Sequence, residues 1–262
     1  MSSEILINIT PSESRAAVVD NGVLQEVFIE RTECRGLVGN IYKGKVVRVL
    51  PGMQAAFVEV GLERAAFIHA ADIQGPVKNS ETARRQPDSI SSLLHEGQSL
   101  VVQVTKDPIG SKGARLTTHM SIPSRYLVFM PNTQHVGISQ RIEDETERER
   151  LRTLVQNCMS AEGLSEESGF ILRTAAEGAG EDEILSDTRY LQRVWGKVKE
   201  RIKTVQAPGK IYEELPLHLR TFRDFIRPDV DKVLIDSREN FQNAQEFSQT
   251  FVPEVTDKLE YY

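Results

Sequence analysis

Alternating apolar and polar positions predict a β-meander over the first thirty residues. The alternation runs through residues 4–10, 15–20 and 23–30, and a period of two is typical of strands with one buried face. Asn21-Gly22 separates the last two stretches and favours a two-residue hairpin turn. The sequence therefore predicts three antiparallel strands whose apolar face needs a cover.

Residues 36–118 predict a small closed β-barrel. Five short apolar runs are separated by turn signals at Pro51-Gly52, Gly61 and 108–110, a spacing that indicates an all-β unit. Residues 74–92 interrupt this pattern with Pro, Ser, Asn and charged side chains. We expect that segment to be a surface insertion without chemistry of its own.

Residues 119–209 combine strands with helices. Apolar runs at 126–130 and 169–173 predict buried strands, whereas residues 145–162 and 181–203 carry apolar side chains at helical spacing. Trp195 lies on the apolar stripe of the second helix, so core packing is favoured over base stacking. The acids at the start of this helix indicate helix N-terminal charge.

The last fifty-odd residues predict helices and one strand with no sheet of their own. A linker is expected at 206–209, a strand at 232–235, and a helix capped by Ser237. The barrel closes on itself and the middle unit has its own strands, so these helices can cover only the N-terminal meander. We expect a mixed α/β fold with three units. Residues 1–35 and 210–262 form one α/β domain, residues 36–118 form the barrel, and residues 119–209 form a small α/β unit.

Composition places the chain among ordinary globular proteins. Of its 262 residues 39% are hydrophobic, and no apolar run approaches the roughly 20 residues of a membrane helix. The N-terminus lacks the apolar core of a signal peptide, so the expected location is cytoplasmic, with no membrane partner. Cys34 and Cys158 are isolated and are expected to be buried, inert thiols.

Charge is segregated along the chain, although the net charge is −6. Residues 34–58 and 108–142 contain no acid and four Lys or Arg each, whereas residues 143–187 hold thirteen acids and four bases. Such segregation gives a locally positive surface on an acidic protein. Composition alone leaves a solvated charged surface as an equal alternative to a nucleic-acid interface.

Two aromatic residues in the barrel segment are candidates for stacking on bases. Phe57 and Phe67 lie ten residues apart in the parallel contexts AAF-V and AAF-I. Single-strand binders use aromatic faces as platforms and nearby cations for the phosphates, and the candidate cations are Lys43, Lys45 and Lys112. Alternation does not exclude the other interpretation, in which both rings fill the barrel core.

Four runs carry a family resemblance: NIYKGKVVRVLPGMQAAFVEVGLERAAFIHAADI, SKGARLTTHMSIPSRYLVFMP, GISQRIEDETERERL and GFILRTAAEG. In this order they resemble the bacterial ribonuclease E/G family, its ribonuclease G branch more than its ribonuclease E branch, over nearly the whole chain. The resemblance implies an S1 barrel, which is an OB fold, and a small "5′-sensor" subdomain, both inserted into an RNase H-like domain. It also implies an endoribonuclease of rRNA and mRNA processing and turnover.

The resemblance assigns candidate site residues. It implies that Phe57, Phe67 and Lys112 contact single-stranded RNA, and Arg141, from the second acid-free segment, is a further RNA-binding candidate.

A second implied site binds the 5′-monophosphate of the RNA, for which a preference is expected. Its implied residues are Arg173 and Thr174, with the backbone near Val128. Ribonuclease E has glycine at the position of Ser124, so a serine side chain would narrow this pocket. Spacing alone favours another interpretation, an ordinary strand-end arginine paired with a nearby acid, whereas the resemblance of the run GFILRT favours the phosphate site.

The family's catalytic part is not found in the sequence. The resemblance implies Mg²⁺ held by aspartates in runs like V-D-I-N and I-D-F-I-D, and a zinc-sharing cysteine motif, none of which occurs here. Asp231 and Asp236 flank a strand and are interpreted as caps. We expect no catalytic or metal-binding residue in this chain, Mg²⁺ for the full-length enzyme, and oligomerisation only through the missing part.

Two rival functions remain. One is a non-catalytic S1-type RNA-binding regulator, and the other is a ribosome-associated S1 factor, for which the run GFILRTAAEG has no use.

Overall fold

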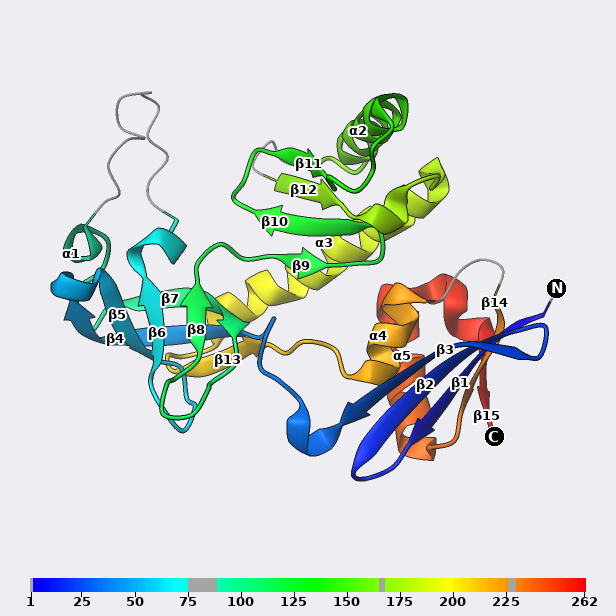
Figure 1. Ribbon diagram of the computed structural model, residues 1–262, viewed down its shortest axis with the longest axis horizontal. Coiled ribbons are helices and arrows are strands. Elements are labelled where there is room, and N and C mark those ends of the chain that lie inside the picture. Colours follow the sequence, from blue (N-terminus) through cyan, green and yellow to red (C-terminus); the bar gives the residue numbers. More distant parts are fainter. Residues whose placement is uncertain (1, 75–88, 165–167, 226–229) are drawn as a thin grey trace.

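The computed structural model describes residues 2–74, 89–164, 168–225 and 230–262. They form a mixed α/β fold with three sheets of five, four and six strands (Figure 1), which confirms the predicted class. In Figure 1 the six-stranded sheet lies at one end of the molecule and the five-stranded sheet, with both chain termini, at the other. The long helix α3 (Glu181–Thr204) runs under the four-stranded sheet towards the six-stranded one.

The five-stranded sheet joins residues from opposite ends of the chain. Its order is β15-β14-β1-β2-β3, with β1 (Ser3–Ile9), β2 (Glu13–Asp20), β3 (Val23–Arg31), β14 (Val230–Ile235) and β15 (Leu259–Tyr261). β1 pairs antiparallel with β2 and parallel with β14. The chain therefore leaves this sheet after β3 and returns beside its first strand.

Two helices, α4 (Leu217–Asp224) and α5 (Arg238–Phe251), pack against one face of this sheet. Strand alternation places Ile5 and its cross-strand neighbour Val233 on that face. Both are 0% exposed, and they belong to one core cluster with Phe222 of α4. The apolar side chains of the N-terminal meander are thus covered by the C-terminal helices.

The six-stranded sheet contains the barrel. β4 (Ile41–Leu50), β5 (Ala55–Glu59), β6 (Ala66–His69), β8 (Arg115–Thr117) and β7 (Ser99–Lys106) follow one another, and β4 also pairs with β7. That pairing closes a five-stranded barrel of the OB/S1 type. Val58, Ile68 and Leu116 point inward and are 0% exposed, so the five apolar runs became the five predicted strands.

Two details of the barrel differ from the sequence predictions. Strand β13 (Gly209–Tyr212) extends the sheet by pairing with β4, where a linker was expected to end and a helix to follow. The predicted insertion at 74–92 lies mostly outside the described residues, but its end forms helix α1 (Ile90–Leu93). Ile90 is 0% exposed in the barrel core, so this end of the insertion is structural.

The four-stranded sheet has the order β11-β12-β10-β9. Its strands are β9 (Ile122–Pro123), β10 (Leu127–Pro131), β11 (Val136–Ile138) and β12 (Ser168–Leu172), and it packs with α2 (Glu145–Ala161) and α3. Trp195 of α3 contacts Phe129, with ring centroids 5.8 Å apart. The predicted core packing of Trp195 is therefore confirmed, whereas β9 and β11 were too short to be predicted.

Local signals set several helix starts. The Ser237 side chain accepts a hydrogen bond from the Asn240 N–H, which confirms the predicted cap of α5. Asp144 caps α2 by accepting from Thr146 N at 3.0 Å. Short 3-10 helices occupy the remaining connections: η1 (Thr32–Cys34), η2 (Pro51–Met53), η3 (Ala70–Asp72), η5 (Thr174–Ala176) and η6 (Pro253–Lys258).

The two cysteines differ from each other. Cys158 is buried, and burial raises the pKa of its thiol. Cys34 is exposed, so the prediction of a buried thiol is wrong there: it ends a short 3-10 helix in which no residue is buried. Among the described residues, no helix combines the length and the apolar composition that a membrane crossing requires.

His218, at the start of α4, makes the stability of the fold depend on pH. It is 7% exposed, and its Nδ1 has no hydrogen-bond partner among the described residues. Burial lowers its pKa to about 4. In the unfolded chain histidine has a pKa of about 6.5, so the stabilisation from neutral His218 is complete above that pH. It is lost as the pH falls towards the folded value.

We expect the stability lost between pH 7.5 and 5.0 to be about 2 kcal/mol smaller in His218→Gln than in the unmodified chain. Asp187 has the opposite pH dependence, because burial raises its pKa to about 6. Its contribution to the free energy of unfolding is lost as the pH rises through that value, in both proteins alike. Urea unfolding of both proteins at each pH gives the contribution of His218 as the difference between their free energies of unfolding. Parallel pH curves for the two proteins would contradict this assignment.

Candidate nucleic-acid interface

A row of side chains crosses the outside of the barrel. The strand register places Arg48 opposite Phe57, Phe57 opposite Phe67, and Phe67 opposite Arg115. Opposite residues in neighbouring strands point to the same face of a sheet. Phe57 is 39% exposed and Phe67 is half-buried, while the alternate positions fill the core. The interpretation in which both rings fill the barrel core does not hold.

Cations flank this row. Lys45 and Arg48 are exposed on β4, and Lys112 is exposed on the loop between β7 and β8. That loop is held by a two-way backbone pairing of Lys112 with Ile109, at 3.0 and 3.2 Å. Arg115 is already paired with Asp72 at 2.8 Å. Lys45, Arg48 and Lys112 are exposed cations near the rings, and Arg48 was not among the sequence candidates.

Lys43 has a different environment from the other two lysines. It is half-buried, and its ammonium donates a hydrogen bond of 2.9 Å to the Ile202 carbonyl in the last turn of α3. A cation at a helix C-terminus satisfies a carbonyl that has no partner within the helix. Lys43 therefore joins the barrel to α3.

Arg173 lies directly after β12, as the sequence indicated. Its backbone N–H donates to the Tyr126 carbonyl at 2.8 Å, and its Nη1 donates to the Ser124 carbonyl. The same nitrogen lies 3.5 Å from an Asp224 carboxylate oxygen. Asp224 is held more closely by Arg223, at 3.0 Å. The Arg173 side chain is 41% exposed, and its Nε and Nη2 have no partner among the described residues.

Hydroxyl groups lie beside Arg173. The Thr174 hydroxyl is 3.1 Å from that of Ser139, which in turn accepts from the backbone N–H of Arg141 at 3.3 Å. Arg141 is exposed. It therefore belongs near Arg173 and not on the barrel. Ser139 was missed because nothing in its sequence neighbourhood marks it. Val128 lies on β10 between Pro123 and Ile171.

The Ser124 side chain does not face this site. Ser124 is 0% exposed, and its hydroxyl donates to Asp187 at 2.5 Å and approaches the Leu127 carbonyl at 2.9 Å. Only its carbonyl reaches Arg173. The expectation that a serine side chain narrows the pocket is therefore corrected, because that side chain points into the interior.

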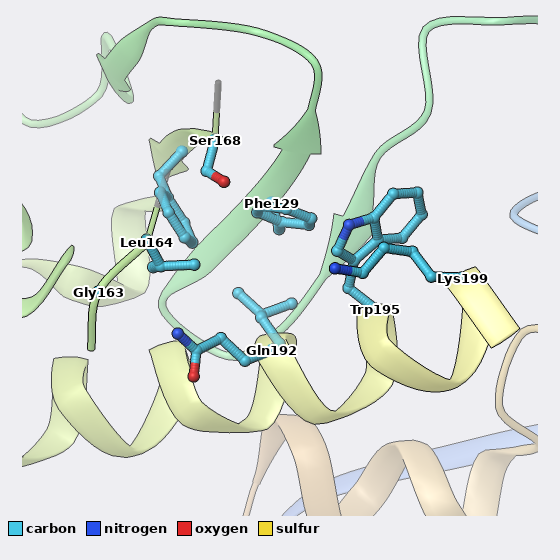
Figure 2. Close-up of a pocket in the computed structure, with 9 residues that line it drawn as sticks. Phe129, Gly163, Leu164, Ser168, Gln192, Trp195 and Lys199 are labelled. Atoms are coloured by element: carbon cyan, nitrogen blue, oxygen red, sulfur yellow. The ribbon is translucent and has the colours of Figure 1, made fainter. Parts of the chain in front are cut away.

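A cavity of about 380 Å³ lies between α3 and the four-stranded sheet (Figure 2). Gln192, Trp195 and Lys199 line it from α3, and Phe129 lines it from the sheet. The Phe129–Trp195 ring contact forms one wall. Trp195 therefore both packs against the core and lines the cavity.

Asp231, the second residue of β14, and Asp236, directly after this strand, hold strands together. Asp236 accepts hydrogen bonds from the Asn8 side chain and, at 2.9 Å, from Ile9 N. Asp231 accepts from Ser3 N at 3.1 Å. Both attach β14 to β1. No group of three or more His, Cys, Asp or Glu residues suited to a metal ion occurs among the residues that the structure describes.

A closed OB-type barrel with aromatic rings and cations on its surface is typical of oligonucleotide-binding modules. Residues 121–262 match the model of the "Ribonuclease E/G family". The chain is 54% identical to "Ribonuclease G" of Escherichia coli (strain K12), over 100% of this chain and 53% of that protein. It is 52% identical to "Ribonuclease G" of Haemophilus influenzae, over 99% and 52%.

"Ribonuclease E" of H. influenzae is 35% identical, over 98% of this chain and 27% of that protein. The chain belongs to the ribonuclease E/G family, as the four sequence runs indicated. It spans about half the length of the ribonuclease G relatives that it matches.

The different positions of Lys43 and Lys45 predict different effects on stability. Lys43→Met removes a charged hydrogen bond from the end of α3 and is expected to lower the free energy of unfolding by about 1–2 kcal/mol. Lys45→Met, on the exposed surface, is expected to change it by less than about 0.5 kcal/mol. Urea unfolding measures both. Equal losses in the two variants would contradict the structural role of Lys43.

Proposed function

We propose that this chain binds single-stranded RNA on the barrel and recognises a 5′-monophosphate at Arg173. In this proposal it is the RNA-recognition part of a Mg²⁺-dependent endoribonuclease that acts in rRNA and mRNA processing and turnover. The observation that carries the proposal is the row of Arg48, Phe57 and Phe67 across the outside of the barrel. Membership of the ribonuclease E/G family supports it.

The barrel row suits a single strand better than a duplex. Bases of an unpaired strand are free to stack on aromatic faces, at about 1–3 kcal/mol per base. Lys45, Arg48 and Lys112 lie where they neutralise phosphates along such a strand. The net charge of −6 does not oppose this, because screening limits charge interactions to about 10 Å at ordinary salt.

The Arg173 site suits a terminal phosphate. Its guanidinium has Nε and Nη2 unoccupied, and two parallel N–H groups match two phosphate oxygens. The Thr174 hydroxyl and the backbone near Val128 supply further contacts, and Arg141 supplies a second positive charge. A terminal monophosphate carries between one and two negative charges near neutral pH, whereas a 5′-hydroxyl carries none.

The chain's own acids do not fit the expected Mg²⁺. The Asp231 and Asp236 carboxylates accept backbone or amide hydrogen bonds at strand ends and do not converge on one point. We therefore assign Mg²⁺-dependent cleavage, and oligomerisation with it, to the half of the relatives that this chain does not match.

The proposal divides the chain into three functional units. Residues 1–35 and 210–262 form the RNase H-like domain, residues 36–118 the S1 domain, and residues 119–209 the 5′-sensor. The five-stranded sheet, which unites β1 with β14, supports the first unit.

Removal of either ring is expected to weaken binding to a short unstructured RNA. Phe57→Ala and Phe67→Ala should each cost about 1–3 kcal/mol, and Lys112→Ala should reduce the salt dependence by about one phosphate. Fluorescence anisotropy measures both effects. Ile29→Ala, an exposed apolar position on β3, is the matched control. If the folded Phe57→Ala and Phe67→Ala variants bind the RNA with normal affinity, the proposal that the two rings stack on bases is refuted.

Recognition of the 5′ end is tested by competition between identical RNAs with a 5′-monophosphate, 5′-hydroxyl or 5′-triphosphate. Arg173→Gln should abolish a monophosphate preference of about tenfold or more, because charged hydrogen bonds contribute about 1.5–3 kcal/mol. Arg173→Lys should keep part of it. Arg152→Gln, on the surface of α2, is the control. Equal affinity of the unmodified chain for all three ends would refute this site.

A further inference from the structure

The turn between β9 and β10 is held from inside by one buried carboxylate. A single oxygen of Asp187, on α3, accepts from Ser124 Oγ at 2.5 Å and from the backbone N–H groups of Tyr126 and Leu127 at 2.9 Å each. The Asp187 carboxylate also accepts a backbone hydrogen bond from Arg125. Asp187 is only 9% exposed. Every residue of the 124–127 turn thus donates to the same side chain.

The other side of this turn holds Arg173. The Ser124 carbonyl accepts from its guanidinium Nη1, and the Tyr126 carbonyl accepts from its backbone N–H at 2.8 Å. Two elements of the fold therefore meet at the turn from opposite sides, α3 through Asp187 and β12 through Arg173.

The same two peptide groups make both sets of contacts. The Ser124 carbonyl shares a peptide plane with Arg125 N–H, and the Tyr126 carbonyl shares one with Leu127 N–H. In a trans peptide the carbonyl and the N–H point in opposite directions. When Asp187 binds the two N–H groups, it fixes the direction of the two carbonyls and polarises them, which strengthens the bonds that they accept.

We infer that Asp187 is the positioning residue of the 5′-phosphate site, because the two peptide groups that it binds hold Arg173: one accepts from the guanidinium and the other from the backbone N–H. This inference rests on the proposed function of Arg173. A buried carboxylate is costly to keep, and burial raises the pKa of Asp187 to about 6. That pKa already includes the opposing effect of the turn's hydrogen bonds, which favour the charged carboxylate, so the carboxylate and the turn stabilise each other.

The test is the monophosphate-over-hydroxyl preference of the full chain in competition binding. Asp187→Asn keeps the size of the side chain, removes the charge, and turns an amide towards the donors of the turn. We expect the preference to fall about tenfold while affinity for the 5′-hydroxyl RNA, which depends on the barrel, stays within twofold. Asp182→Asn, the same change at an exposed position of the same helix, is the matched control and should keep the preference.

A double-mutant cycle separates positioning from general support of the fold. In an Arg173→Gln background, Asp187→Asn should cause no further loss of affinity for the monophosphate RNA if it acts through Arg173. Additive losses, or parallel losses for monophosphate and hydroxyl RNA, would mean that Asp187 only supports the fold. Ser124→Ala, which removes one of the donors to the carboxylate, is the milder variant and should reduce the preference about twofold to fivefold.

The outcomes distinguish this inference from the function on which it rests. An unmodified chain without any monophosphate preference overturns both. If the unmodified chain shows the preference and a folded Asp187→Asn variant keeps it unchanged, only the role of Asp187 is overturned. Where Asp187→Asn does not fold, an unchanged preference in Ser124→Ala has the same meaning.

Discussion

A single rigid helix, α3, sets the distance between the two candidate RNA contacts. Its 24 residues span about 36 Å at the usual rise of 1.5 Å per residue. Asp187, near its N-terminal end, holds the turn against which Arg173 rests, and the Ile202 carbonyl, near its C-terminal end, accepts from Lys43 of the barrel. A strand of RNA that touches both sites therefore meets them at a separation that the helix fixes.

Much of this architecture followed from the sequence because alternation reports which face of a strand is buried. It predicted the barrel, and the parallel contexts of Phe57 and Phe67 made both rings candidates, to which the family resemblance added its support. Three contacts could not be predicted from the sequence for one reason: each joins a side chain to a group far away along the chain. Lys43 meets Ile202, Ser124 meets Asp187, and Arg173 meets Asp224. A periodicity identifies a face, but it does not identify the partner that another element places there.

Asp187 shows that the same limit of sequence analysis applies to charged residues. In the sequence it is one acid in a stretch with thirteen of them, and nothing distinguishes it from its solvated neighbours. Only the approach of the 124–127 turn gives it hydrogen-bond donors and removes it from water. By contrast, the acids at the start of α3 were interpreted correctly, because helix N-terminal charge is a local effect.

The contact between Arg173 and Asp224 decides how readily Arg173 exchanges partners. Asp224 already accepts from Arg223, which is 7% exposed and also pairs with Glu214 at 2.6 Å. Its charge is therefore largely satisfied without Arg173. A partly exposed pair at 3.5 Å contributes at most about 1 kcal/mol. A phosphate bound by two parallel hydrogen bonds gains more than that. Arg173 is thus oriented by backbone carbonyls and paired only weakly with an acid, and this is the state that the proposed binding of a terminal phosphate requires.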